Sequence, residues 1–237
     1  HTERMLGAMG VEVAVDGGTI SMVGGQELRG NRIPIPGDLS SATFIILGTL
    51  LSQDAEIKIE NVGVNPTRTG VIDILKAMGA DIRLENKRIF GEEPVADIRV
   101  RASRLTGCDV DPALVSLAID EFPALFVAAA AAEGETCFSG LEELRVKESD
   151  RIAAMADGLR RLGIAVDEAP DGATVRGGDF RGGVVDSYHD HRVAMALALA
   201  ATGADDDGVI RGVDNVNTSF AGFRECIVVL GGPVELV

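Results

Sequence analysis

The 237-residue chain has no tryptophan and one tyrosine, and its three cysteines are scattered. Cys108, Cys137 and Cys226 form no CxxC pair, and an odd count without metal-ligand spacing is typical of reduced thiols in a cytoplasmic protein. The longest apolar run, 122–132, is too short to cross a bilayer, and no signal peptide is visible. We therefore expect a cytoplasmic protein.

Positive charge is also scarce. The chain has 22 Lys and Arg against 37 Asp and Glu, which gives a net charge of −15. This balance argues against binding to nucleic acid or to an anionic membrane, because both need a basic surface. Aromatic residues make up 4% and hydrophobic residues 46%, so the predicted core is aliphatic and helix-rich, in one large domain or two small ones.

Against this acidic background, three cations gather in the segment LRVKESDR at the start of a predicted helix. They are Arg145, Lys147 and Arg151. Free N–H groups at a helix N-terminus and nearby Arg side chains favour an anion, and Glu148 between the cations could move protons. If the helix starts early, Lys147 and Arg151 share one face. The alternative is a solvated, self-paired run of charges.

Two acids, Asp120 and Glu121, interrupt an apolar stretch in the segment IDEFP just before an Ala-rich helix. A partly desolvated carboxylate has a raised pKa, which suits it to proton transfer. The alternative is that Asp120 caps the helix.

A third polar segment, 188–192, contains two histidines and Arg192 before an apolar helix. A metal site would need a third ligand, so the histidines are interpreted as packing or capping residues and no metal is expected. Arg192 at a helix start opposes the helix dipole unless an anion compensates its charge.

One pattern, an amphipathic helix followed by glycine and a strand, recurs four times. The glycines are Gly10, Gly79, Gly163 and Gly231, which lie 69, 84 and 68 residues apart. Glycine after the last apolar residue of a helix suits the C′ position. The four copies are 2–15, 66–84, 148–166 and 217–237.

Apolar helices and hairpins are predicted to complete each unit, in an α/β layer structure. A solenoid is the alternative, but closure into one body suits three full units better. The helices are 40–51, 121–132 and 191–201; the strands after them are 56–62, 135–141 and 208–213; the hairpin turns are 16–18, 85–87 and 171–172.

Both ends of this array are expected to be incomplete. The chain begins at His1 rather than Met, the first unit has only its last helix and hairpin, and the final strand, 233–237, has no predicted partner. We expect upstream chain to complete both units, and the Pro-containing segment 31–38 to cross between domains.

Five motifs together resemble the 5-enolpyruvylshikimate-3-phosphate synthase family, in its C-terminal part and in the family's order. They are PGDLSSATF (36–44), NPTRTG (65–70), IDEFP (119–123), LRVKESDRI (144–152) and DHRVAM (190–195). The resemblance implies an enolpyruvyl-transferase-like, inside-out α/β body built of βαβαββ repeats. It also implies one near-complete domain, 38–237, lacking its N-terminal strand, preceded in 1–37 by the end of a second domain.

The family's reaction transfers a carboxyvinyl group from phosphoenolpyruvate to the 5-hydroxyl of shikimate 3-phosphate. By resemblance, Asp120 contacts the shikimate hydroxyls and accepts a proton, and Lys147 contacts shikimate 3-phosphate. Glu148 shuttles the proton at C3 of phosphoenolpyruvate. The resemblance assigns phosphoenolpyruvate binding to Arg151, Arg192 and the pocket residue His191, and leaves Arg145 structural, paired with Glu142 or Asp150.

The resemblance implies no cofactor, a monomer, and as partners the two small substrates and the missing N-terminal half of the same protein. Because the family's active site lies between two domains, this chain alone is expected to be inactive. The alternatives are an enzyme that transfers enolpyruvate to UDP-N-acetylglucosamine and a non-catalytic folded fragment.

Many family members carry a Lys that contacts phosphoenolpyruvate in the segment matching 216–220, which here reads VNTSF. The lack of this Lys, with IDEFP and LEELRVKESDR, resembles the glyphosate-tolerant branch. We therefore predict that the complete enzyme tolerates glyphosate, and an inhibition curve with micromolar sensitivity would contradict this.

Overall fold

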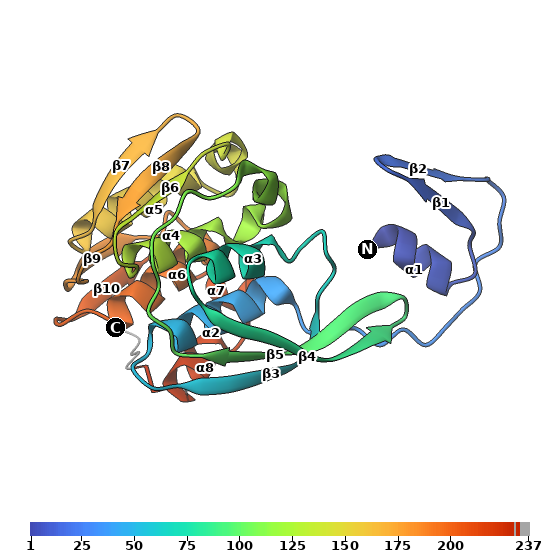
Figure 1. Cartoon of the computed structure of the whole chain (residues 1–237), viewed down its shortest axis with the longest axis horizontal. Coiled ribbons are helices and arrows are strands. Elements are labelled where there is room, and N and C mark those ends of the chain that lie inside the picture. The colour runs from blue at the N-terminus through green and yellow to red at the C-terminus, as the bar shows by residue number, and fades with distance from the viewer. Residues whose placement is uncertain (230, 233–237) are drawn as a thin grey trace.

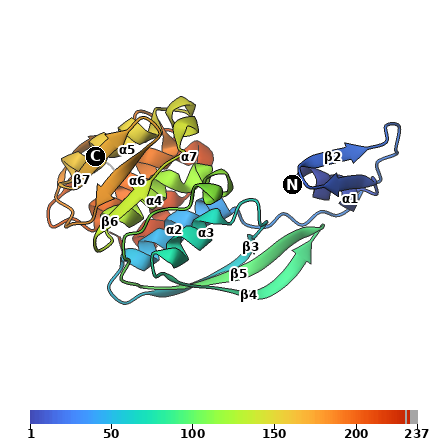
Figure 2. The same cartoon turned by 45° about the horizontal axis from the view of Figure 1, so that its top comes forward.

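Three apolar helices pack against one another at the centre of the main body of the computed structural model (Figures 1 and 2). They are α2 (Leu39–Leu51), α4 (Phe122–Ala130) and α6 (His191–Thr202), and every residue of α4 is buried. Each lies where the sequence predicts an apolar helix. The structure describes residues 1–229 and 231–232.

Amphipathic helices alternate with these three. They are α3 (Gly70–Ala77), α5 (Arg151–Arg161) and α8 (Phe223–Val229). Ile152, Met155 and Leu159 of α5 are buried at helical spacing, as predicted. The single helix expected over the fourth copy is instead two, because a short helix, α7 (Val216–Ser219), ends before Gly222 with its φ of +86°. The predicted strand 233–237 lies outside the described residues.

The sheets lie on the outside of these helices (Figure 2). Two antiparallel sheets have the orders β3-β5-β4 and β6-β8-β7, and β9 and β10 pair in parallel. The strands are β3 (Glu56–Gly63), β4 (Asp81–Phe90), β5 (Glu93–Arg101), β6 (Glu135–Phe138), β7 (Ala165–Ala169), β8 (Gly172–Arg176), β9 (Gly183–Asp186) and β10 (Gly208–Arg211). Short 3-10 helices are η1 (Pro112–Leu117), η2 (Ile119–Glu121) and η3 (Glu142–Val146).

The first two units have the full βαβαββ order, and the third is described from β9 through α8. The first strand of each unit differs. The third unit begins with the full strand β9, whereas the first two begin with isolated parallel bridges, such as Gly37 to Val62 and Asp109 to Cys137. Helices inside and sheets outside confirm the inside-out α/β class with βαβαββ order.

The hairpin turn predicted at 85–87 is wrong. Strand β4 continues to Phe90, the chain reverses at Gly91 and Glu92, and 85–88 is a bulge. Asn86 adopts a φ of +49° there, and its side chain donates to the carboxylate of Asp97 on β5 at 2.9 Å. Because Asp97 accepts this bond from across the sheet, the Asn bends the strand without reversing it. The hairpins at 16–18 and 171–172 form as predicted.

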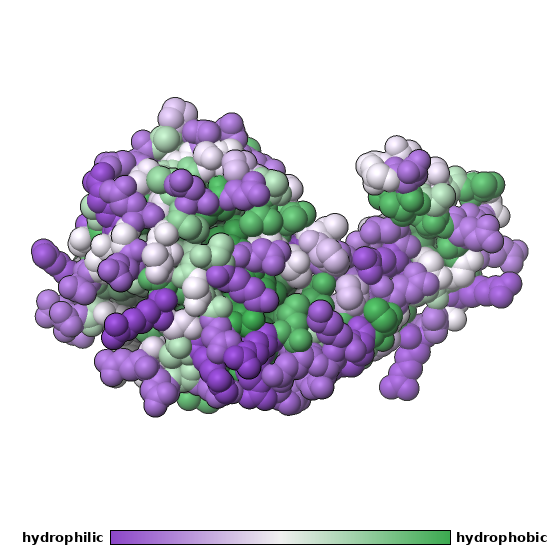
Figure 3. Space-filling view, viewed as in Figure 1, coloured by the Kyte–Doolittle hydropathy of each residue, from purple (hydrophilic) through white to green (hydrophobic). Residues whose placement is uncertain are grey.

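The N-terminal segment, comprising α1 (Thr2–Ala8), β1 (Val13–Asp16) and β2 (Thr19–Met22), lies apart from the main body (Figure 1). The guanidinium of Arg4 donates to the carbonyl of Glu92 at the tip of the β4–β5 hairpin, at 3.0 Å. Figure 3 shows a hollow between segment and body, and all four residues of β2 are exposed. The division into 1–37 and 38–237 stays a prediction.

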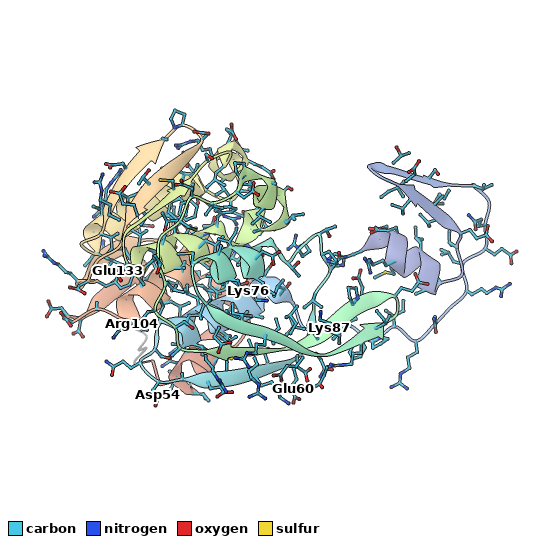
Figure 4. All side chains as sticks on the ribbon, viewed as in Figure 1. Asp54, Glu60, Lys76, Lys87, Arg104 and Glu133 are labelled. Carbon is cyan, nitrogen blue, oxygen red and sulfur yellow. The ribbon has the colours of Figure 1, made fainter. Side chains whose placement is uncertain are left out.

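Many charged side chains outside the site face solvent, although Asp97 is buried. The six labelled in Figure 4, Asp54, Glu60, Lys76, Lys87, Arg104 and Glu133, are all exposed. Among the described residues, no helix combines the length and the apolar character needed to span a membrane.

The four repeat glycines share one backbone conformation. Gly10, Gly79, Gly163 and Gly231 have φ between +87° and +96°. Left-handed backbone costs a residue with a Cβ about 1–2 kcal/mol, so Gly79→Ala should lower the free energy of unfolding by that amount. Urea unfolding measures this. The control is Gly30→Ala, where φ is not left-handed and no atom lies within 4 Å of the new Cβ; equal losses in the two variants would contradict the prediction.

Candidate active site

The N-termini of five helices meet at one end of the body. Ser40 in the first turn of α2 donates to Glu121, which precedes α4, and accepts from Arg68, which precedes α3, at 3.1 Å. At the start of α6, Arg192 donates to the carbonyl of Asp120 at 3.0 Å, and Arg151, the first residue of α5, bonds to the residue that caps α6. The helix dipoles at these ends make the site favourable for anions.

A buried ion pair joins α5 to α6. The guanidinium Nε of Arg151 donates to Oδ2 of Asp190 at 2.8 Å, and the two side chains are 1% and 0% exposed. Asp190 also accepts from the backbone N–H groups of Arg192 and Val193, so it caps α6. One edge of the guanidinium, Nη1, is buried without a hydrogen-bond partner among the described residues, and lies 3.5 Å from Asp120.

Opposing effects act on the pKa of Asp190. Burial by itself would raise it, but the Arg151 guanidinium and the bonds from backbone N–H groups outweigh burial and leave the pKa below its usual value. The loop before α6 brings Asp190 to its capping position through two residues with left-handed backbone, Tyr188 at φ +54° and His189 at φ +57°. Strained backbone of this kind persists where surrounding contacts over-determine it.

Four cations surround the carboxylate of Asp120. Nitrogen-to-oxygen distances are 3.7 Å from Arg68, 3.8 Å from Lys147, 3.5 Å from Arg151 and 3.9 Å from Arg192. All four exceed hydrogen-bond length, so the cations keep N–H donors for other acceptors. The structure therefore brings Lys147, Arg151 and Arg192 together around Asp120, as the resemblance implies.

Glu148 and His191 lie next to this group. Glu148 is half exposed and accepts from Arg151 at 2.5 Å. Burial, with a smaller effect of Arg192, lowers the pKa of His191, so the ring is neutral over more of the physiological range. A neutral imidazole both donates and accepts a hydrogen bond.

Two residues of LRVKESDR lie differently from the cation cluster that the segment alone suggests. Arg145 is not part of the cation group, because it bonds to Asp150, Glu168 and two backbone carbonyls; of its two expected partners, Asp150 is confirmed. Helix α5 begins only at Arg151, so Lys147 reaches Asp120 from the extended chain after η3 rather than from the same helix face.

The alternative role of Asp120 as a helix cap is wrong. Helix α4 begins after Glu121 and has no side-chain cap. The carboxylate of Asp120 instead lies among the cations, 3.5 Å from Nη1 of Arg151.

Sequence reasoning gave no role to Arg68 and none of its own to Glu121, although both lie within quoted motifs. Arg68 lies in NPTRTG and Glu121 in IDEFP, so the motifs contain both residues. That the two lie close together depends on the tertiary structure, because they are 53 residues apart in the sequence. Glu121 is buried, which raises its pKa, while the hydroxyl of Ser40 and the nearby Arg side chains oppose that rise. Among the described residues, no group of three His, Cys, Asp or Glu side chains is arranged to hold a metal ion.

A family model described as EPSP synthase (3-phosphoshikimate 1-carboxyvinyltransferase) matches residues 1–227. A 3-phosphoshikimate 1-carboxyvinyltransferase of Alkalilimnicola ehrlichii is 54% identical over 95% of this chain and 51% of its own length. One of Methylococcus capsulatus is 52% identical over 100% of this chain and 54% of its own. The chain thus spans about half the length of the curated relatives it matches.

The chain is also similar to solved structures of enolpyruvyl transferases. An EPSP synthase from Acinetobacter baumannii is 49% identical, with a TM-score of 0.96 over 99% of this chain and 55% of that one. An enolpyruvyl transferase from Streptomyces tendae, 19% identical over 97% of this chain and 52% of that one, shares the fold with a TM-score of 0.72.

Removing the buried carboxylate should destabilise the chain strongly. Asp190→Ala leaves Arg151 buried without its partner and removes the cap of α6, which costs about 3–5 kcal/mol of unfolding free energy. Because the folded-state pKa is lowered, this stabilisation is fully present above the ordinary Asp pKa of about 4 and is lost as pH falls below it. Urea unfolding at several pH values measures both.

The control is Asp111→Ala, which removes a cap of η1 alone and should cost about 1 kcal/mol. Equal losses in the two variants, or a wild-type advantage that does not shrink in acid, would contradict the role given to the ion pair.

Proposed function

The chain belongs to the EPSP synthase family, and we propose that within a longer protein it supplies one side of an active site that transfers a carboxyvinyl group. The donor is phosphoenolpyruvate and the acceptor is the 5-hydroxyl of shikimate 3-phosphate, in the shikimate pathway of aromatic amino acid biosynthesis that leads to chorismate. The observation that carries the proposal is the ring of four cations around Asp120 at converging helix N-termini.

This reaction makes definite demands on its site. The 5-hydroxyl oxygen bonds to C2 of phosphoenolpyruvate and loses its proton, while C3 gains one. The tetrahedral intermediate then expels phosphate as C3 gives a proton back. Such chemistry needs a base beside the hydroxyl, an acid beside C3, and cations for two phosphates and a carboxylate.

We assign the acceptor side to Asp120 and Lys147. Asp120 is the proton acceptor for the 5-hydroxyl, and a quarter of its side chain is exposed, which leaves it open to a ligand. Lys147, 3.8 Å away, contacts shikimate 3-phosphate and is oriented by Glu143 at 2.5 Å.

We assign the donor side to Arg151, Arg192 and His191. Nη1 of Arg151 still needs an acceptor, which a carboxylate or phosphate oxygen supplies, and Arg192 adds a second fork of donors. Glu148 shuttles the proton at C3. Half exposed and bonded to Arg151, it is well placed to exchange protons with the donor.

Only one side of the site lies in this chain, so the isolated chain is proposed to be inactive. The upstream half of the protein is its partner, and closure of the two halves excludes water from the intermediate. A cytoplasmic monomer suits this role.

The decisive experiment measures phosphate release from shikimate 3-phosphate and phosphoenolpyruvate, for this chain alone and joined to its upstream half. Release is expected only from the joined form. Asp120→Asn in the joined form should lower kcat by about 100- to 10,000-fold, because it removes the proton acceptor and keeps the shape.

The joined form is also assayed with UDP-N-acetylglucosamine as acceptor. Release with that sugar nucleotide and none with shikimate 3-phosphate would replace the proposal by the sister activity. Release with neither would leave a non-catalytic protein. Activity of the isolated chain would contradict the half-site.

A further inference from the structure

The two adjacent acids of η2 point in different directions. A 3-10 helix turns about 120° per residue, so consecutive side chains diverge. Asp120 faces the cation ring with a quarter of its side chain exposed, whereas the side chain of Glu121 is 3% exposed and accepts from the hydroxyl of Ser40. A carboxylate this buried must be paired to remain charged.

Two arginines from separate elements flank both acids. From Oε1 of Glu121, Arg68 lies at 3.9 Å and Arg192 at 3.7 Å. From Oδ2 of Asp120, the same two guanidinium groups lie at 3.7 and 3.9 Å. Two carboxylate oxygens therefore hold two guanidinium groups side by side, although like charges repel.

The donors of Arg68 are largely unused. Among the described residues, its guanidinium makes one hydrogen bond, to Ser40 at 3.1 Å, out of five N–H donors. Arg145 shows the contrasting structural case, with four hydrogen bonds to two carboxylates and two carbonyls. Arg68 also keeps 38% of its side chain exposed, so a ligand can reach it.

The turn that carries Arg68 is held in place. Asn65, which is buried, accepts from the N–H of Thr67 at 3.1 Å and from its hydroxyl at 3.0 Å. The N–H of Arg68 donates to the carbonyl of Asn65 at 2.8 Å. At Gly70 a Cβ would lie 2.8 Å from Leu117, so α3 packs tightly against η1. A fixed turn lowers the entropy cost of using the side chain above it.

We propose that Arg68 is a further anion-binding residue of this site, and that Glu121, with Ser40, is a positioning residue that holds Arg68 beside Arg192. The ligand is a phosphate or carboxylate group of a substrate, which the paired forks grip through several charge-assisted bonds. This inference rests on the proposed function for the identity of that substrate.

The test uses the joined protein with Arg68→Gln and Arg68→Lys, and measures kcat and the KM of each substrate. Arg68→Gln should lower kcat/KM about 10- to 100-fold. A rise in KM for phosphoenolpyruvate or for shikimate 3-phosphate identifies which one supplies the anion. Arg68→Lys should recover part of the loss, because it keeps the charge without the fork.

The matched control is Arg83→Gln, which removes an exposed Arg outside the site and should change kcat/KM less than twofold. A value for Arg68→Gln within twofold of wild type, or equal losses for the Gln and Lys variants, would overturn the binding role.

A double-mutant cycle tests the positioning role of Glu121. Glu121→Gln keeps the shape and should lower kcat/KM about tenfold by releasing the arginines. If it acts through Arg68, the double variant with Arg68→Gln loses less than the product of the single losses. A loss equal to the product would overturn the coupling.

A binding measurement tests the inference without an activity assay. Inorganic phosphate should raise the thermal unfolding midpoint of the wild-type joined protein and raise it less in Arg68→Gln, and equal rises would overturn the inference. A wild type that binds phosphate but releases none from the substrates would sink the proposed function and leave the anion site standing.

Discussion

The buried ion pair between Arg151 and Asp190 joins the two helices that bring two of the four cations into the site, and the rest of the site depends on it. Asp190 is the N-cap residue of α6 and so fixes the position of Arg192 in its first turn. Arg151 is the first residue of α5. Burying both partners is costly unless each is paired and hydrogen-bonded. Asp190 is satisfied by one guanidinium edge and two backbone N–H groups, which leaves another edge of Arg151 directed at Asp120.

The inside-out architecture explains why so many cations gather in a chain of net charge −15. Each βαβαββ unit sends its apolar helix through the centre, so the N-termini of α2, α4 and α6 emerge at the same end. Asp38 caps α2 and Asp190 caps α6, whereas α4 has no side-chain cap and directly follows the acids of η2. The acids balance the arginines at distances too long for hydrogen bonds, and this keeps the donors available.

Much of the arrangement could be predicted from local signals. Hydrophobic spacing located α5 and the three central helices, and glycine after each amphipathic helix marked the left-handed turns later seen at φ between +87° and +96°. The motifs located Asp120, Lys147 and Arg151. The failures occurred where a distant residue decided the outcome. Asn86 looked like a turn residue, but Asp97 from the next strand holds it in a bulge.

The sequence by itself determined the fold class, the family and the residue types of the site, because helical periodicity, glycine positions and short motifs are local. Only the tertiary structure decided which charges cooperate. It selected Asp150 as the partner of Arg145, added Arg68 from a segment far along the chain, and separated Asp120 from Glu121 in role. The physical reason is that charge pairing falls off over a few ångströms, while the sequence separations involved run to tens of residues.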